Sequence, residues 1–205
     1  MKAEIERVER RRADTADASC KAMAEAMALE KRGMKHTHGE ALSMPPLHGP
    51  TLHAKEANPG RAWSSLVHRF PSAEWAEAYR TALNNNPAYR DAGKCWTFGT
   101  VAIIVLADPT IGLPRDAGIV LDVHGGECRA ATYVEGADRS GAAEFTFVAS
   151  YTRWQEVIEG KLDPIKGLME GKLKLGRGHL PTIVRFVEAA RQLVVSASKV
   201  PTSFV

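Results

Sequence analysis

The sequence predicts an α+β protein in which helices pack on one face of a mainly antiparallel β-sheet. Apolar or alternating runs between residues 95 and 149 are typical of strands, and amphipathic segments on either side have helical spacing. The connections between the strand runs are too short for a helical crossover, so we expect neighbouring strands to be antiparallel. The expected order is one helix, four strands, two short helices, a fifth strand and a last helix.

The first helix of the globular part is predicted to start at residues 71–74, where Pro-Ser-Ala-Glu is a typical helix start. Trp75, Tyr79 and Leu83 then follow one turn apart, so they share one face, which we expect to be buried. The Asn-Asn-Asn-Pro run at residues 84–87 is predicted to end this helix.

Four strands are predicted next. Residues 95–106 end in a run that is apolar on both faces, which is typical of a buried strand. Residues 119–124 alternate between two faces, and the Gly-Gly pair at 125–126 predicts a tight hairpin turn into residues 128–134. Residues 143–149, which carry two phenylalanines on one face, are the fourth predicted strand.

Residues 150–175 are predicted to form two short helices and a strand. Thr152 and Gln155 have the spacing of a capping box at the start of the first helix, and Asp163-Pro164 is a typical start for the second. Gly160 and Gly171 are expected to end the two helices, because glycine readily takes the left-handed conformation of a helix end.

Two elements complete the predicted domain. Residues 172–175 alternate lysine and leucine, which predicts a strand with its lysines in solvent. A last helix from about residue 180 is apolar around most of its circumference and is therefore expected to be largely buried. Its apolar residues are Ile183, Val184, Phe186, Val187, Ala190, Leu193 and Val194.

Composition is that of an ordinary soluble globular protein. Of the 205 residues 44% are hydrophobic and 25% charged, and the net charge of +3 gives no indication of nucleic-acid binding. Cys20, Cys95 and Cys128 have no paired spacing, so we expect reduced thiols. We find no signal-peptide core, membrane-span run or peroxisomal tripeptide, and these observations together predict a cytoplasmic protein with no transmembrane segment.

Residues 1–62 are predicted to be an extension that precedes a domain of residues 63–205. Residues 1–33 have a thin stripe of alanine and methionine, which predicts a helix, whereas residues 34–62 are rich in proline, glycine and histidine. The helix is either solvated or a partner-binding element, since methionine suits adaptable contacts. The second segment is either disordered or lies along another protein's surface.

The histidines of the extension are the one candidate metal site. His36 and His38 could hold a metal ion, but no cysteine joins them, and a single His-x-His pair is a weak signal. Solvated loop histidines are the favoured interpretation, so no metal or other cofactor is predicted.

A series of short motifs in residues 143–176 resembles a known family. In chain order these motifs are Phe145-Thr146-Phe147, Trp154, Gly160-Lys161-Leu162-Asp163-Pro164, Leu168-Met169 and Gly171-Lys172-Leu173-Lys174-Leu175. The series resembles the sterol carrier protein 2 family, a lipid-binding domain, and the likeness extends as an order of elements over residues 63–198. The resemblance implies a five-stranded sheet covered by helices, with an apolar tunnel that takes a sterol, fatty acid or acyl-CoA, and no enzymatic activity.

The first functional hypothesis is therefore a non-catalytic carrier for an apolar or amphipathic ligand. Each candidate lining residue is also explained by ordinary burial in a core, so the tunnel depends on the resemblance. Lysines and arginines near the expected mouth (Lys161, Lys172, Lys174 and Arg177) would meet an anionic headgroup or be solvated. The candidate lining is Trp96, Phe98, Ile119, Leu121, Phe145, Phe147, Trp154, Ile158, Leu162, Leu168, Met169 and Phe186.

The second hypothesis is an accessory subunit of a multiprotein enzyme, in which residues 1–62 wrap a protein partner. The two hypotheses are compatible if the carrier presents an apolar substrate to that partner. A catalytic function is disfavoured, because His124 and His179 have no partner acid or nucleophile at an informative spacing.

Overall fold

The structure is a computed structural model that describes residues 20, 21, 25, 67–137 and 143–205. Cys20, Lys21 and Glu25 are helical. The predicted helix over residues 1–33 otherwise lies outside the described residues. So do the predicted segment 34–62 and its histidine pair.

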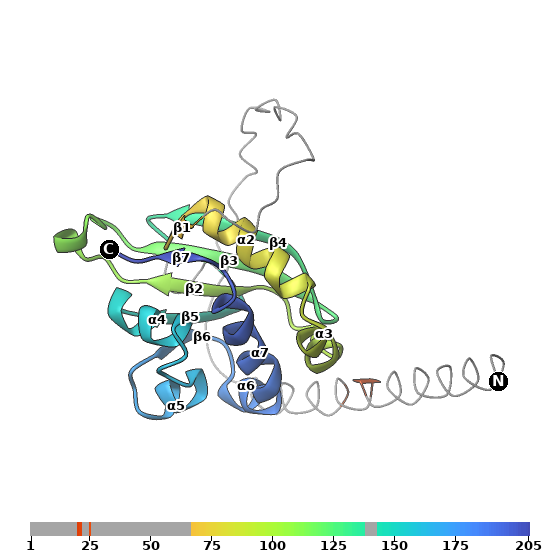
Figure 1. Cartoon of the computed structure of the whole chain (residues 1–205). Helices are drawn as coiled ribbons and strands as arrows, with labels where there is room; N and C mark the ends of the chain where they lie inside the picture. Colours follow the sequence, from red (N-terminus) through yellow and green to blue (C-terminus); the bar gives the residue numbers. More distant parts are fainter. Residues whose placement is uncertain (1–19, 22–24, 26–66, 138–142) are drawn as a thin grey trace, which may run out of the picture.

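A five-stranded mixed sheet forms the centre of the molecule (Figure 1). The strands lie in the order β4-β3-β2-β5-β6, and three of the four neighbouring pairs are antiparallel. The predicted fold class is therefore confirmed. The strands are β2 (Val101–Val105), β3 (Ala117–His124), β4 (Glu127–Glu135), β5 (Phe145–Ala149) and β6 (Lys174–Arg177).

The pairing of β2 with β5 is parallel, so the expectation that all neighbours are antiparallel is wrong here. Val101 lies opposite Phe145, and Val105 lies opposite Ala149. The β3–β4 hairpin comes between these strands in the sequence, and β5 joins the other side of β2. Because β2 has five residues and is therefore about 17 Å long, the nine residues between β4 and β5 in the sequence are enough to pass from one end of it to the other without a helical crossover.

The helices cover one face of the sheet. That face and the helices share the main core, which includes Trp75, Leu121, Trp154 and Phe186. A smaller cluster, including Ala102, lies on the other face. The helices are α2 (Ala73–Asn84), α3 (Pro87–Gly93), α4 (Tyr151–Ile158), α5 (Pro164–Met169), α6 (Leu180–Arg185) and α7 (Val187–Ala197).

Most of the helix starts and ends predicted from local sequence signals in residues 150–175 are confirmed, with one error. Asp163 caps α5 by accepting hydrogen bonds from the backbone N–H groups of Ile165 and Lys166, at 2.9 and 3.0 Å. Gly160 and Gly171 have φ of 73° and 71°, as predicted for helix ends. The predicted capping box is wrong, because β5 ends at Ala149 and the chain enters α4 directly at Tyr151.

Three further elements differ from the prediction. Asn86 and Pro87 start α3 immediately after α2, so the run expected only to end a helix also begins one. The last helix is two helices, α6 and α7, that meet at Phe186. A parallel two-stranded sheet of β1 (His68–Arg69) and β7 (Thr202–Ser203) ties the two ends of the domain together.

Cys20 and Cys95 form a disulfide, so the expectation of three reduced thiols is wrong for this pair. Cys128 is free and buried. The disulfide fastens one helical residue of the N-terminal extension to the loop that precedes β2. The cytoplasmic location, which was inferred partly from reduced thiols, stays a prediction. Among the described residues, no helix is both long and apolar enough to cross a membrane.

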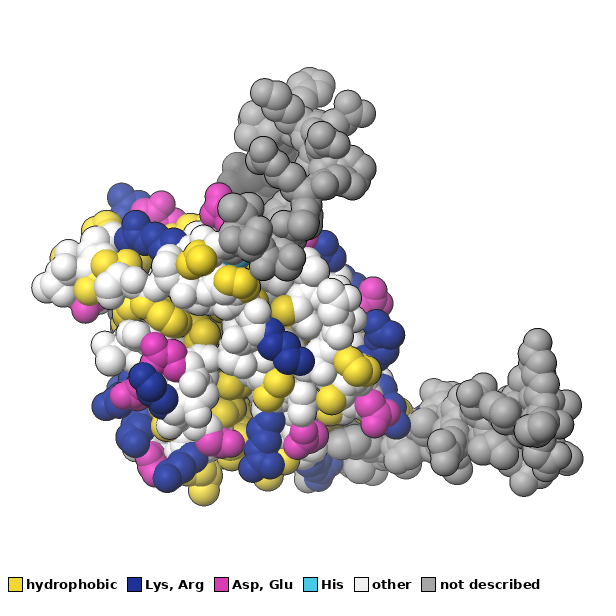
Figure 2. Space-filling model, in the orientation of Figure 1, with side chains coloured by type: hydrophobic (Ala, Val, Ile, Leu, Met, Phe, Trp, Pro, Cys, Tyr) yellow, Lys and Arg dark blue, Asp and Glu magenta, His cyan; other side chains and the backbone are white. Residues whose placement is uncertain are grey.

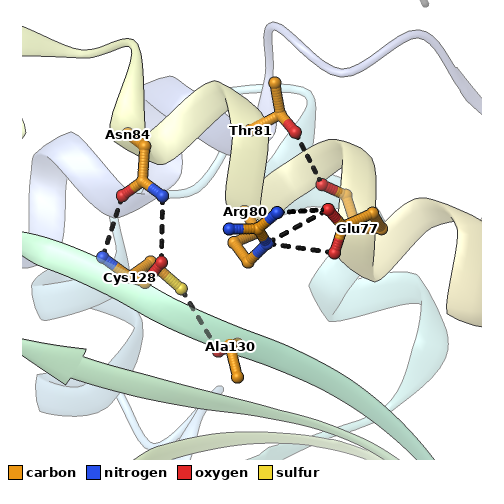
Figure 3. Close-up of polar contacts among 6 residues, drawn as sticks. All are labelled: Glu77, Arg80, Thr81, Asn84, Cys128 and Ala130. Atoms are coloured by element: carbon orange, nitrogen blue, oxygen red, sulfur yellow. Dashed lines mark hydrogen bonds and ion pairs between the residues drawn. The ribbon is translucent and has the colours of Figure 1, made fainter. Parts of the chain in front are cut away.

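The side-chain amide of Asn84 joins the end of α2 to strand β4 (Figure 3). Its Nδ2 donates to the carbonyl of Cys128 at 2.9 Å, and its Oδ1 accepts from the N–H of Cys128 at 2.9 Å. Cys128 lies beside the irregularity in the β3–β4 register. The amide therefore satisfies two backbone groups of β4 at the place where the ladder is disturbed.

Replacing Asn84 with alanine should lower the free energy of unfolding by about 1–3 kcal/mol, because both backbone groups of Cys128 lose this partner. Urea unfolding followed by circular dichroism measures the change. The matched control is Thr81→Ala, which removes a hydroxyl that donates to the Glu77 carbonyl on the exposed side of α2 (Figure 3). The control should stay within about 0.5 kcal/mol of the parent, and equal losses in both variants would contradict the assignment.

The disulfide predicts a specific pattern of thiol reactivity. Burial raises the pKa of the Cys128 thiol to about 12, so at neutral pH it stays protonated and unreactive in the folded chain. We expect no reaction with a thiol reagent in the native protein, one reactive thiol after unfolding, and three after unfolding with reductant. Peptide mapping without reductant should find Cys20 linked to Cys95, and three reactive thiols before reduction would refute the pairing.

Candidate functional site

An apolar cavity lies between the sheet and the helices α4, α5, α6 and α7. It has about 70 Å³ of room for water-sized groups. The sheet contributes its floor through β2, β3 and β5, Leu173 lies just before β6, and α2 closes one end with two aromatic rings. Its lining is Phe70, Trp75, Tyr79, Val101, Ile103, Leu121, Phe147, Trp154, Val157, Ile158, Pro164, Ile165, Leu168, Leu173, Ile183, Ala190, Leu193, Val194 and Ala197.

The few polar atoms on the lining side chains form hydrogen bonds with other groups of the protein. Trp154 Nε1 donates to the Ile104 carbonyl at 2.8 Å, and Trp75 Nε1 donates to Thr202 Oγ1 at 2.8 Å. The Tyr79 hydroxyl donates to the Leu193 carbonyl at 3.0 Å, and burial raises its pKa well above the usual value. These three rings therefore present carbon to the cavity, which offers a ligand apolar surface and no charged group.

A second apolar cavity, with about 50 Å³ of room, lies beside the first towards α3. Val101, Phe147, Ile183, Ala190 and Leu193 line both cavities, so these side chains separate the two spaces. Two adjoining cavities therefore occupy the place where the resemblance implies one tunnel. The remaining lining of the second cavity is Tyr89, Gly93, Trp96, Val123, Phe186 and Ala189.

The first cavity opens between α5 and α7. Most of its half-buried lining residues belong to these two helices, for example Leu168 on α5 and Leu193 on α7, and the others are Ile103 and Phe147 on the floor of the cavity. Hydrophobic side chains are visible along this seam (Figure 2). Outside it, Arg191 Nε of α7 lies 3.4 Å from Asp163 Oδ2, at the start of α5. This ion pair spans the opening.

The candidate lining residues fall into three groups. Leu121, Phe147, Trp154, Ile158 and Leu168 line the first cavity. Trp96 and Phe186 line the second, together with Phe147. The residues that line neither cavity are Phe98, Ile119, Phe145 and Leu162, which lie in or against the core, and Met169.

Met169 is 76% exposed and does not line either cavity. Its spacing from Ile165 places both on one helical face, but α5 ends at Met169 and the side chain lies in solvent. Sequence reasoning also missed lining residues on α2 and α7. The spacing of Trp75 and Tyr79 on α2, and of Ala190, Leu193 and Val194 on α7, was the signal that could have found them.

Side chains that could catalyse a reaction or bind a metal rarely come together in the part of the chain that is described. Within it, no three His, Cys, Asp or Glu side chains come together as a possible metal site. His124 is exposed, and His179 Nδ1 lies 3.3 Å from Thr182 Oγ1 at the start of α6. Neither histidine lines the apolar cavities.

Comparison with known proteins agrees with this architecture. A sequence-family model described as the SCP-2 sterol transfer family matches residues 80–176. A crystal structure of sterol carrier protein 2 superposes with a TM-score of 0.60 at 40% sequence identity, covering 63% of this chain and 97% of that one. The chain belongs to the sterol carrier protein 2 family.

A second solved structure has nearly the same similarity. The solution structure of TT1886 from Thermus thermophilus, a conserved hypothetical protein described as possibly a sterol carrier protein, is 40% identical with a TM-score of 0.58. The match covers 63% of this chain and 87% of TT1886. No curated protein is significantly similar to the chain in sequence.

The Asp163–Arg191 pair at the opening predicts a pH dependence. Hydrogen bonds from the Lys166 and Ile165 amides, with the Arg191 charge, hold the pKa of Asp163 below its ordinary value. A lowered pKa means that Asp163 stabilises the fold at pH values above the unfolded-state pKa, about 3.9, and loses that effect as pH falls through the folded-state pKa.

Asp163→Ala should therefore cost about 1 kcal/mol at neutral pH, chiefly through the lost helix cap, and the cost should shrink below about pH 4. Urea unfolding at a series of pH values measures the difference from the parent. Asp91→Ala, which removes an exposed pair with Lys94, is the control and should change stability by less than about 0.5 kcal/mol. A cost for Asp163→Ala that is the same at acidic and neutral pH would contradict the linkage.

Proposed function

We propose that this sterol carrier protein 2 family member is a non-catalytic carrier that binds a lipid with a long apolar part in the cavity between the sheet and helices α5 and α7. The observation that carries the proposal is the lining of that cavity, which is apolar and keeps its polar atoms bonded within the protein. Such a lining favours hydrocarbon and gives no orientation to a polar substrate.

The energy available from this lining is sufficient for useful affinity. Burying a sixteen-carbon chain gains roughly 10 kcal/mol at ~0.8 kcal/mol per CH₂. Lost translational and rotational freedom and the ordering of the chain offset part of this gain. A carrier has to release its ligand, so a moderate net affinity suits the function.

The size of the cavity limits how a long chain enters. About 70 Å³ of room is less than a lipid needs, so the ligand must move side chains that separate the two cavities. Phe147, Ile183 and Leu193 are shared by both linings, and their displacement would join the two spaces into one elongated site. An extended acyl chain fits such a joined site.

The opening between α5 and α7 provides a place for a polar headgroup. Arg191 is half exposed there and is paired with Asp163, and Lys166 lies nearby on α5. A carboxylate or phosphate headgroup would compete with Asp163 for Arg191 while the hydrocarbon remains inside. We therefore favour an anionic amphiphile, such as a fatty acid or an acyl ester, over a neutral sterol.

The accessory-subunit hypothesis stays a prediction. It depends on residues 1–62, nearly all of which lie outside the described part of the chain. The Cys20–Cys95 disulfide is compatible with it, because it would hold a partner-binding extension next to the lipid-binding domain.

Blocking the cavity should abolish ligand binding without unfolding the chain. Ala190 lines both cavities and is half buried, so Ala190→Phe places a ring in the space that the ligand needs. We expect the affinity for a fluorescent long-chain fatty acid to fall at least tenfold, a loss of about 1.4 kcal/mol or more. Fluorescence titration measures the affinity.

Val195→Phe is the matched control, because Val195 lies on the same helix, is 40% exposed and lines neither cavity. It should bind the fatty acid as the parent does, and circular dichroism should show both variants folded. If Ala190→Phe does not fold, Leu168→Trp at the opening replaces it. Unchanged affinity in a folded cavity variant, or no saturable binding by the parent chain, would refute the proposed site.

A further inference from the structure

One hydroxyl in the wall of the second cavity has no partner in the described part of the chain. Tyr89 on α3 lines this cavity and is only 3% exposed. None of the described residues forms a hydrogen bond with its hydroxyl. Its pKa is raised by burial, with a further contribution from the Cys128 thiol, so the hydroxyl keeps its proton at neutral pH. Buried polar groups are nearly always hydrogen-bonded, which makes Tyr89 an exception that needs a reason.

The Tyr89 hydroxyl borders space that a small group can enter. Among the described residues, His68 Nε2 is the one buried side-chain nitrogen or oxygen that is both sealed from such space and without a partner. The Tyr89 hydroxyl is therefore not sealed, and the cavity that its side chain lines is the second one. Trp96 has the other polar side-chain atom of this lining, and its Nε1 donates to the Gly99 carbonyl at 2.9 Å. In this lining, as far as the chain is described, only Tyr89 has a hydrogen bond left to make.

The backbone at Tyr89 is held firmly without any use of the hydroxyl. Asn86 Oδ1 caps α3 and accepts from the Tyr89 N–H at 3.3 Å, while Asn86 Nδ2 donates to Ser196 Oγ of α7 at 2.9 Å. One turn after Tyr89, a Cβ added at Gly93 would lie 3.0 Å from Gly126 Cα, so α3 also packs closely on the β3–β4 turn. A side chain on a fixed element of this kind can orient a ligand.

Tyr89 lies far from the opening of the first cavity. In Figure 1 α5 and α3 lie on opposite sides of the helix layer, with α6 and α7 between them. When Phe147, Ile183 and Leu193 give way and the two cavities join, a chain that enters between α5 and α7 reaches the second cavity with its tail. The Tyr89 hydroxyl then meets the end of the ligand that is farthest from the headgroup.

We propose that the Tyr89 hydroxyl forms a hydrogen bond with an oxygen in the tail half of the bound lipid, so that the protein selects fatty acids or acyl esters that carry a hydroxyl or a ketone there. A tyrosine hydroxyl both donates and accepts, so it satisfies either kind of oxygen. A charged tail group does not suit the site, because the described residues that line it include no lysine, arginine or histidine. The inference deepens the proposed function and rests on it, since the lipid has to occupy the joined cavities.

Competition with the fluorescent fatty acid tests the proposal on the full chain. The probes are hexadecanoic acids with a hydroxyl at mid-chain or on the last carbon, and at least one should bind about tenfold more tightly than plain hexadecanoic acid, as one net hydrogen bond predicts. The control ligand carries its hydroxyl on the carbon next to the carboxylate and should bind as the plain acid does. Equal affinities for all four acids would overturn the proposal and leave the carrier function standing.

Tyr89→Phe removes the hydroxyl and keeps the ring. This variant should bind the hydroxy acids no more tightly than hexadecanoic acid. Tyr133→Phe is the matched control, because it makes the same change at a half-buried tyrosine of β4 that lines neither apolar cavity. The control should keep the parent's preference, and a preference that survives Tyr89→Phe would overturn the assignment.

Urea unfolding of the ligand-free chain separates a ligand-binding hydroxyl from a structural one. Tyr89→Phe should leave the unfolding midpoint unchanged or raise it, because no hydrogen bond within the protein is lost. Tyr151→Phe should lower the midpoint, because its hydroxyl donates to the Phe70 carbonyl at 3.3 Å and accepts from the Val205 N–H at 2.9 Å. An equal fall in both variants would show that the fold already uses the Tyr89 hydroxyl and would overturn the proposal.

The same titrations distinguish this inference from the proposed function. A parent chain that binds none of the acids would refute the carrier function, and this inference with it, whereas binding without preference refutes the inference alone. Cholesterol is the remaining probe, because its hydroxyl would have to enter first to reach Tyr89. Binding of cholesterol that depends on Tyr89, without a preference among the acids, would assign the hydroxyl to a sterol and overturn the proposal.

Discussion

The buried hydrogen bond from Trp154 Nε1 to the Ile104 carbonyl fixes the layer of helices on the sheet. Ile104 belongs to β2, the central strand, which pairs with β3 on one side and β5 on the other. Trp154 belongs to α4, which leaves β5 with only Ser150 between them. The bond therefore joins the first helix after β5 to the strand next to it. The depth of the space between sheet and helices is set at this contact.

The same bond determines the chemistry of the cavity. An indole N–H left unpaired in an apolar space would cost about 1–3 kcal/mol, and it would attract water or a polar ligand. Because Trp154, Trp75 and Tyr79 each donate outward to the protein, their rings face the cavity with carbon. A cavity of this kind keeps its apolar character and selects hydrocarbon by exclusion of polar groups.

Features that depend on neighbouring residues could be predicted from the sequence, whereas long-range ones could not. The Asp163 cap depends only on neighbouring residues, and it occurs at the predicted start of α5. The predicted capping box of Thr152 and Gln155 is wrong, because α4 starts directly after the end of β5. The five strands were predicted from local residue patterns, but neither the parallel β2–β5 pair nor the Cys20–Cys95 disulfide leaves a local signature. A pattern that predicts burial also does not tell a cavity wall from solid core. Phe145 and Phe147 share one predicted strand face, yet only Phe147 lines the cavities. The Phe145 ring is covered instead by Trp96, with 4.9 Å between the ring centroids.

Helices α5 and α6 form part of the cavity wall and part of the exposed surface at the same time. Both helices are only six residues long. In each helix one residue points inward and the next is exposed: Leu168 and Ile183 line the cavity, whereas Met169 and Val184 are exposed. Helices this short gain little stability of their own, so their position depends on tertiary packing and on the Asp163–Arg191 pair. A ligand headgroup that competes with Asp163 for Arg191, as in the proposed function, would loosen the wall of the cavity where a lipid has to enter.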